Sequence, residues 1–244
     1  MNALRLAALV ATPVALVVLT GCPNPNTYGT PRTVPAGKVQ MVASLEGVGV
    51  STSSQSSTVN GATTTVAGES FYAPTAPSVG VRIGLTDSLD LGLRLSELSS
   101  LQADAKFNFL KSNVFDMAVA PGLQGAYVSA GGTSLGLVYI NLPLILGINF
   151  SHAATLVLTP GFTYAVATAS VADGSGTGAF ANGSAPLIRM GVGFNIRIGN
   201  QFALQPEVTA LKGFNDLGAL YWNFGLGFLI GTSKNAMPNY DDVN

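Results

Sequence analysis

Apolar and polar residues alternate along most of the chain. In residues 78–85 (SVGVRIGL), every second position from Val79 to Leu85 is apolar, and the positions between them hold small residues and one arginine. Residues 89–95 (LDLGLRL) and 101–109 (LQADAKFNF) repeat the pattern. A period of two residues is typical of a β-strand with one apolar and one polar face. The pattern therefore predicts an all-β protein.

Ten strand-like segments follow one another, and the connections between them alternate in length. Short turns such as 86–88 (TDS) and 151–153 (SHA) follow every second segment, whereas the other connections are longer and polar. Short turns at one end and long loops at the other are typical of membrane barrels with an even number of strands. We therefore predict an antiparallel up-and-down transmembrane β-barrel of about ten strands. The segments are residues 38–49, 77–86, 89–96, 101–110, 114–127, 136–150, 154–167, 186–198, 201–211 and 219–231.

Four prolines lie inside these segments, and they make a barrel with fewer strands an alternative. Proline has no N–H to donate to a neighbouring strand, so it is usually confined to strand edges and bulges. If one segment is broken there, the barrel has eight strands. The four residues are Pro121, Pro143, Pro160 and Pro206.

Charged residues within the predicted strands share one face. The chain has 11 Lys and Arg and 12 Asp and Glu residues, and eleven of these lie opposite the mainly apolar face. A Lys or Arg facing lipid at mid-membrane costs about 2–4 kcal/mol, so we assign the charged face to the lumen. Because unpaired buried charges are costly, we expect a salt-bridged and mostly closed lumen. The eleven residues are Lys38, Glu46, Arg82, Asp90, Arg94, Asp104, Lys106, Asp116, Arg189, Arg197 and Glu207.

The composition agrees with a membrane barrel and excludes other classes. Charged residues make up 9% of the chain, against about 25% in typical soluble domains, and the mean hydropathy is +0.42. Past the first 21 residues, no apolar run approaches the roughly 18 residues of a membrane helix. A closed barrel is the other structure that spans a membrane with its backbone hydrogen bonds satisfied. The net charge of −1 gives no basic surface for nucleic acid.

The N-terminus has the layout of a secretory signal peptide. Residues 1–21 contain one arginine, then an apolar stretch, then small residues. Cys22 follows and is the only cysteine, so no disulfide can form within the chain. Leu19, Thr20, Gly21 and Cys22 resemble the lipobox of bacterial lipoproteins, which implies a covalent lipid on Cys22. The alternative is an ordinary signal peptide with a cysteine there by chance.

Residues 37–231 resemble the small bacterial outer-membrane β-barrels of eight to ten strands. The resemblance implies a place in the outer membrane, with outer-membrane lipid as partner. We expect residues 22–36 to be a flexible linker, residues 232–244 to be a periplasmic tail, and the lipid at Cys22 to lie on the periplasmic side. Barrels of this class usually end on an aromatic residue, whereas here Phe228 is followed by sixteen further residues.

We predict that the protein is not an enzyme. Enzymatic barrels of this kind use histidine-containing sites, and this chain has one histidine, His152, in a predicted turn. One histidine and one acylated cysteine offer no metal-ligand set, and no cofactor is expected beyond the lipid. Three functions stay open: a structural or surface-interaction barrel with an unidentified protein partner, a narrow channel for ions or small solutes, and a soluble lipocalin-like lipoprotein with an apolar interior.

Overall fold

The computed structural model describes residues 24–231 except 53–54, 60–61, 67, 97–98, 131–132, 172–178, 200 and 215–218. The described residues form fifteen strands. They are β1 (Val39–Thr52), β2 (Gln55–Val59), β3 (Ala62–Val66), β4 (Ser70–Pro74), β5 (Ser78–Gly84), β6 (Leu89–Ser96), β7 (Ser100–Leu110), β8 (Phe115–Val119), β9 (Gly122–Ala130), β10 (Thr133–Ser151), β11 (Ala154–Leu158), β12 (Gly161–Val171), β13 (Ala179–Ile198), β14 (Phe202–Gly213) and β15 (Ala219–Gly231).

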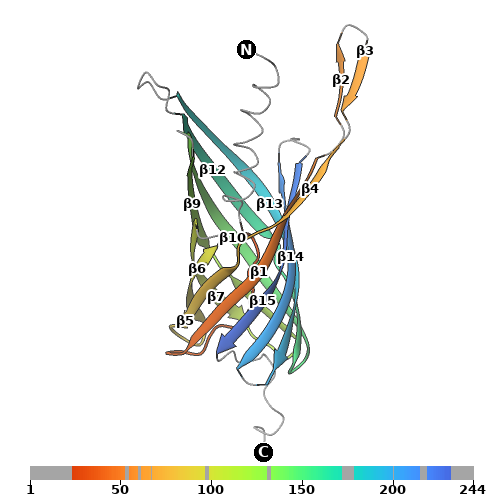
Figure 1. Cartoon of the computed structure of the whole chain (residues 1–244). Helices are drawn as coiled ribbons and strands as arrows, with labels where there is room; N and C mark the ends of the chain where they lie inside the picture. The colour runs from red at the N-terminus through yellow and green to blue at the C-terminus, as the bar shows by residue number, and fades with distance from the viewer. Residues whose placement is uncertain are drawn as a thin grey trace, which may run out of the picture.

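The strands close into an antiparallel barrel (Figure 1). The closing seam joins the first and last strands, β1 and β15, over a register that runs from Gln40 opposite Gly231 to Thr52 opposite Ala219. β8 with β9, and β11 with β12, each form one strand of the wall, since both members of each pair hydrogen-bond to β10 or β13. The wall therefore has ten strands, as predicted.

Two of the four prolines mark breaks in the wall. Ala120 and Pro121 separate β8 from β9, and Thr159 and Pro160 separate β11 from β12. Each break is confined to the residues around the proline, because its missing N–H interrupts the ladder only there. Pro143 instead lies within β10 opposite Gly161, and Pro206 lies within β14 opposite Leu226. The eight-stranded alternative is therefore wrong.

The two ends of the barrel differ. We call the end with the short connections at 85–88, 111–114 and 152–153 the turn end, and the opposite end the loop end. At the loop end, β4 pairs with residues 47–51 of β1, and the hairpin β2–β3 extends beyond them (Figure 1). The sequence analysis predicted a long loop between the first two wall strands, and three strands lie there instead.

The two faces of the wall have opposite polarity. In β1, Val39, Met41 and Leu45 point outward with 47–60% of their surface exposed, whereas Ser44 and Glu46 point inward and are buried. The same division holds in the other wall strands, where buried Asn, Gln, Thr and charged residues face the lumen. The apolar face is therefore outside, and the lipocalin-like alternative is wrong. Over the described part of the chain, no helix is long and apolar enough to cross a membrane.

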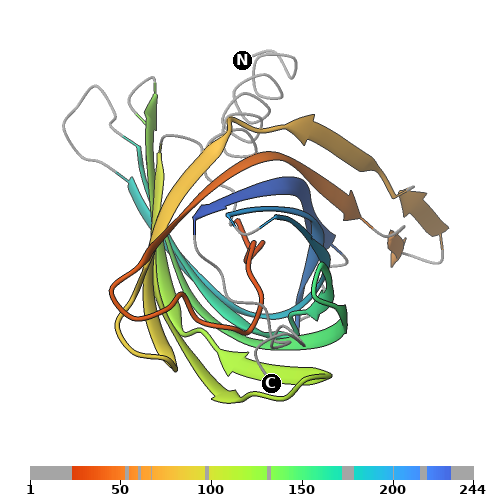
Figure 2. The ribbon, with the colours of Figure 1, turned by 90° about the horizontal axis from the view of Figure 1, so that it is seen from below.

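Residues 24–36, which we call the threaded segment, lie inside the barrel. Figure 2 shows this segment within the ring of strands, and its residues Asn24, Asn26, Tyr28 and Val34 each have 2% or less of their surface exposed. The expectation of a flexible linker over residues 22–36 is therefore corrected for residues 24–36. The segment is fixed because its backbone and side chains bind the inner wall.

Candidate functional site

The threaded segment runs through the lumen from the loop end to the turn end. The side-chain amide of Asn24 donates to Ser78 (3.3 Å), the first residue of β5, and to Ser96 (3.4 Å), the last residue of β6. Nine residues later, the hydroxyl of Thr33 donates to the carbonyl of Asp87, in the turn between the same strands. The segment then leads into β1, which begins at the turn end.

Acidic side chains of the wall accept hydrogen bonds from the backbone of the threaded segment. Glu207, on β14, accepts from the N–H of Thr27 (2.7 Å) and of Tyr28 (2.9 Å). Asp90, on β6, accepts from the N–H of Val34 at 2.9 Å. Glu207 is 4% exposed and Asp90 is fully buried. Such charge-assisted bonds are about twice as strong as neutral ones, so these two carboxylates fix the segment at two heights in the lumen.

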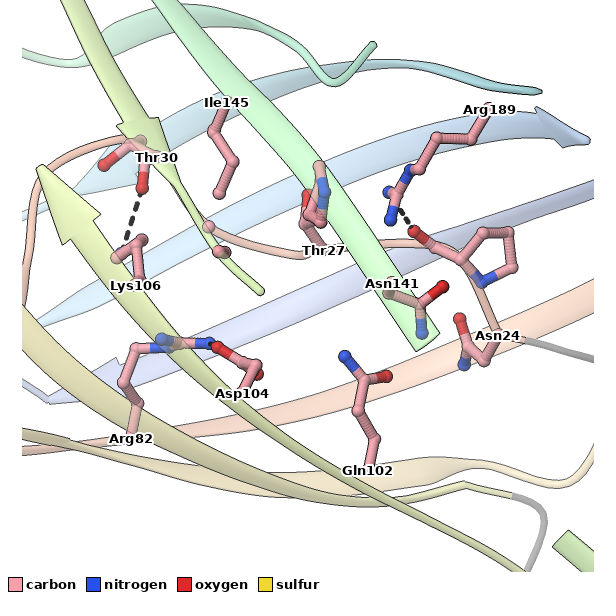
Figure 3. A pocket seen from close by; sticks show the side chains of 14 residues that line it. Asn24, Thr27, Thr30, Arg82, Gln102, Asp104, Lys106, Asn141, Ile145 and Arg189 are labelled. Atoms are coloured by element: carbon pink, nitrogen blue, oxygen red, sulfur yellow. Dashed lines mark hydrogen bonds and ion pairs between the residues drawn. The ribbon is translucent and has the colours of Figure 1, made fainter. Parts of the chain in front are cut away.

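Two arginines of the wall donate to carbonyls near the start of the segment. Arg94, on β6, donates to the carbonyls of Asn24 (3.1 Å) and Asn26 (2.7 Å). Arg189, on β13, donates to the carbonyl of Pro25, which lies between them (Figure 3). Both guanidinium groups belong to residues that are less than 10% exposed. Three consecutive carbonyls of the segment are therefore held from opposite strands of the wall.

Lys106 and Arg32 connect the second half of the segment to the wall. Lys106, on β7, donates to the carbonyls of Thr30 (3.0 Å) and Arg32 (2.7 Å), and Figure 3 shows the first of these bonds. The guanidinium of Arg32 lies 2.9 Å from a carboxylate oxygen of Asp116, on β8. In this ion pair, the charged side chain comes from the threaded segment and its partner from the wall.

Charged residues of the wall also pair with one another. Arg82, on β5, forms ion pairs with Asp90 and, at 2.5 Å, with Asp104 (Figure 3). The ammonium of Lys106 lies 3.4 Å from the second carboxylate oxygen of Asp90. Asp90 is therefore shared by two cations and the backbone of the threaded segment, and none of its surface is exposed.

Amide side chains of the segment bind polar groups of the wall. Asn24 donates to the carboxylate of Glu46. Asn26 donates to Asn223 at 2.6 Å and to the hydroxyl of Tyr28 at 2.8 Å. Because buried polar groups are costly unless they are hydrogen-bonded, these contacts favour one position of the segment in the lumen.

Glycines on the inner wall make room for the bulky residues of the segment. A Cβ at Gly225 would lie 2.1 Å from the hydroxyl of Tyr28, and a Cβ at Gly227 would lie 2.5 Å from its ring. A Cβ at Gly147 would lie 2.8 Å from Pro31. The wall and the segment therefore fit each other closely at these three positions.

The structure gathers nine of the eleven predicted lumen charges around the threaded segment. Lys38 is exposed just before β1, and Arg197 is half-buried near the turn end of β13. Cys22 lies outside the described residues. The sequence analysis missed the segment's own residues, above all Asn24, Asn26, Tyr28 and Arg32. The glycines at alternate positions of β15, beside large apolar residues, were the available indication that something packs against them.

Two cavities beside the described part of the threaded segment are small. A cavity of about 30 Å³ lies between the segment and the wall, lined by Arg82, Gln102, Asp104, Asn141 and Arg189 among others (Figure 3). A second cavity of about 30 Å³ lies beside Tyr28 and Arg94. Since one water needs at least about 10–15 Å³ measured this way, each cavity has room for two or three waters at most.

His152 is exposed in the turn between β10 and β11. No three His, Cys, Asp or Glu side chains of the described ranges are placed to hold a metal ion.

We predict that Gly227→Val loosens the threaded segment. The new side chain would occupy the position of the Tyr28 ring, and overpacking of this kind typically costs about 1–3 kcal/mol. The variant barrel should lose its compact, fast-migrating form in SDS at a lower temperature than the unchanged protein. Gly183→Val is the control, because Gly183 is exposed and a Cβ there meets nothing within 4 Å. Equal transition temperatures for both variants would contradict the close fit.

No protein-family model and no curated protein matches the chain. Solved structures with a similar fold include Ail, the attachment invasion locus protein of Yersinia pestis, at 10% identity over 80% of this chain and 99% of that chain, with a TM-score of 0.37. Neisserial surface protein A is 13% identical over 79% and 96%, with a TM-score of 0.37. The outer membrane protease OmpT from Escherichia coli is 9% identical over 82% and 97%, with a TM-score of 0.42. The likeness concerns the fold alone, and the strand pairing of the chain itself defines that fold as a closed antiparallel β-barrel.

Proposed function

We propose that the protein is a non-enzymatic outer-membrane lipoprotein whose barrel is kept closed by its own threaded segment. Its role is structural or one of surface interaction, and Cys22 carries the lipid anchor. One observation carries the proposal. The buried charges of the wall are used to bind backbone groups of residues 24–34, so the lumen serves to hold a peptide segment.

The outward face supports a place in the membrane. Large apolar side chains surround the barrel, including Met41, Leu93, Leu101, Ile140 and Ile188, each at least 45% exposed. In water such a continuous apolar belt would drive aggregation, whereas in a bilayer it meets acyl chains. Outer-membrane lipid is therefore the partner we propose for the wall.

The arm at the loop end supports a role in surface interaction. Tyr72 of β4 stacks on Phe224 of β15 with ring centroids 4.9 Å apart, and Trp222 lies 5.4 Å from the same ring. This stack holds β4 against β1 and so fixes the base of the β2–β3 hairpin. A rigid base is what a hairpin needs to present itself to a protein partner.

The mostly closed, salt-bridged lumen predicted from the sequence is part of the same proposal. Arg82, Asp90, Asp104 and Lys106 form a continuous set of ion pairs. Their pairing offsets part of the desolvation of charges in the lumen. The segment satisfies further donors and acceptors on Arg94, Arg189 and Glu207.

Conductance separates this proposal from the alternative of a narrow channel. The purified full-length protein in a planar bilayer should give no resolved current steps, because water-sized cavities do not form a continuous path for hydrated ions. Gly227→Val in the same bilayer should produce intermittent steps, which shows that inserted protein is present and that an emptied lumen conducts. Steady steps from the unchanged protein would overturn the closed barrel in favour of a channel.

A further inference from the structure

We propose that the lipid on Cys22 lies at the loop end of the barrel, in the outer leaflet, with its acyl chains in a groove on the outer wall. This inference rests on the lipid anchor of the proposed function. It differs from the periplasmic side predicted from the sequence, and the reason is the direction of the threaded segment.

The position of Asn24 determines which end Cys22 can reach. Asn24 lies at the loop end of β5 and β6, where it bonds to Ser78 and Ser96. Cys22 is two residues away, which is at most about 7 Å of extended chain. The length of β6 from Ser96 to Leu89 at the turn end is roughly 20 Å. The path back through the lumen is also filled by residues 24–36, so Cys22 stays near the loop end.

At the loop end, the barrel wall is shorter beside Asn24, where the threaded segment begins. β5 begins at Ser78, β6 ends at Ser96 and β7 begins at Ser100, all at about the same level, whereas β1 and β9 continue farther. In the described ranges, β4 pairs with β1 alone, and residues 128–130 of β9 pair with β10 alone. Among the described residues, the ends of β5, β6 and β7 therefore leave a notch in the wall between β1 and β9. Asn24 lies beside this notch, because it bonds to Ser78 and Ser96 at the ends of β5 and β6.

An apolar groove lies on the outer wall directly below this notch. It has a volume of about 520 Å³, and its lining includes Leu95 and Ser99 beside the β6–β7 connection. Gly125 and Gly136 form its floor, because they carry no side chains there. Its remaining walls are Leu101, Tyr127, Val138 and Val166, with Leu137, Ala126 and Thr168 at the edges.

The groove fits the acyl chains of Cys22 by position and chemistry. Its upper end is one residue from Ser96, the contact of Asn24, so a lipid on Cys22 reaches it by crossing the rim of the wall. Its lining is mainly apolar, with Ser99 and Thr168 as the polar residues, and a hydrocarbon chain in it completes the apolar belt where two glycines interrupt it. The acyl chains would then pack on the outer face of the wall below the notch, while the threaded segment packs on its inner face.

A protease site inserted between Pro23 and Asn24 tests the side of the membrane. In cells grown with labelled palmitate, protease added to intact cells should cut this site and release the label from the barrel. The same site inserted between Ser151 and His152, at the turn end, is the control and should be cut only after the outer membrane is permeabilised. Cutting of the first site only after permeabilisation would overturn the inference while leaving a labelled lipoprotein.

Incorporation of labelled palmitate tests whether Cys22 carries a lipid, separately from where that lipid lies. If no palmitate is incorporated, both the anchor and its groove are wrong, and the cutting pattern still reports where the N-terminus emerges. For a labelled protein, a photoactivatable palmitate analogue should crosslink to groove residues at positions 95, 99, 101, 125–127 and 136–138, and Gly125→Trp should reduce that crosslink at least fivefold. Crosslinks confined to the turn end, near Phe109 and Phe150, would overturn the proposed place of the lipid.

Discussion

Glu207→Ala is expected to release the threaded segment and to open the barrel to ions. The substitution leaves the N–H groups of Thr27 and Tyr28 without an acceptor in a buried site. An unsatisfied buried donor costs about 1–3 kcal/mol, and the site of Thr27 is only part-buried, so the two together should lower the free energy of unfolding by roughly 2–5 kcal/mol. Urea unfolding in detergent micelles measures the loss of stability, and planar-bilayer recording measures the opening.

Glu207→Gln is the matched control. The amide keeps one acceptor oxygen and nearly the same volume, but it loses the charge that strengthens both hydrogen bonds. Its loss of stability and its open fraction should fall between those of the unchanged protein and Glu207→Ala. If Glu207→Ala unfolds and conducts as the unchanged protein does, this carboxylate does not hold the segment.

Asp90→Ala is expected to be the most destabilising single change in the wall. Asp90 is fully buried, pairs with Arg82 and Lys106, and accepts a hydrogen bond from the N–H of Val34. Removing one partner from a buried ion pair typically costs about 3–5 kcal/mol, because the remaining charge is left without compensation. The measurement is again equilibrium unfolding, supported by the temperature at which the barrel loses its compact form in SDS.

Asp104→Ala provides the comparison for Asp90. Asp104 also pairs with Arg82, but its side chain is 10% exposed and Arg82 keeps Asp90 as its second partner. Its loss should therefore cost clearly less than that of Asp90. If both substitutions lower the free energy of unfolding equally, the contacts of Asp90 with two cations and the threaded segment add nothing to stability beyond one ion pair.

The strands of the wall could be predicted because the environment of each residue, lipid or lumen, determines whether that residue is apolar or polar. Lipid on one side and a polar lumen on the other impose a two-residue period, which is visible in Val79–Leu85 and again in β6 and β7. The ten strands and the inward side of Arg82, Arg94 and Glu207 follow from that period. The prolines between β8 and β9 and between β11 and β12 interrupt the ladder only locally, so they do not change the count.

The threaded segment was not predictable from the same pattern. Residues 24–36 (NPNTYGTPRTVPA) have no period and are rich in turn-forming residues, as a linker would be. About half of their polar contacts with the wall use backbone N–H and carbonyl groups, which do not depend on the side chains of the segment. The partners of Arg94 and Arg189 could therefore not be named from the sequence, where the expected partners were carboxylates.

The side of the membrane expected for the lipid anchor also depends on the path of residues 24–36, which the sequence did not predict. A flexible linker of about fifteen residues would leave Cys22 at the end of the barrel where β1 begins. Passage through the lumen instead moves the start of the segment to the level of Ser78 and Ser96, at the opposite end. The direction of thirteen residues inside the barrel thus changes which leaflet the lipid is expected to enter.

An engineered disulfide tests most directly whether residues 24–36 pass through the lumen. A Cβ at Gly227 lies 3.1 Å from the Cβ of Tyr28, within a small shift of the roughly 3.5–4.5 Å found in disulfides. The protein with Tyr28→Cys and Gly227→Cys, in a Cys22→Ser background, should oxidise and close a loop from residue 28 to residue 227. Its boiled, unreduced form should then migrate faster than its reduced form. Tyr28→Cys with Gly125→Cys, on the outer face, should not. Failure of the first pair to oxidise, or equal oxidation of both pairs, would contradict the threaded lumen.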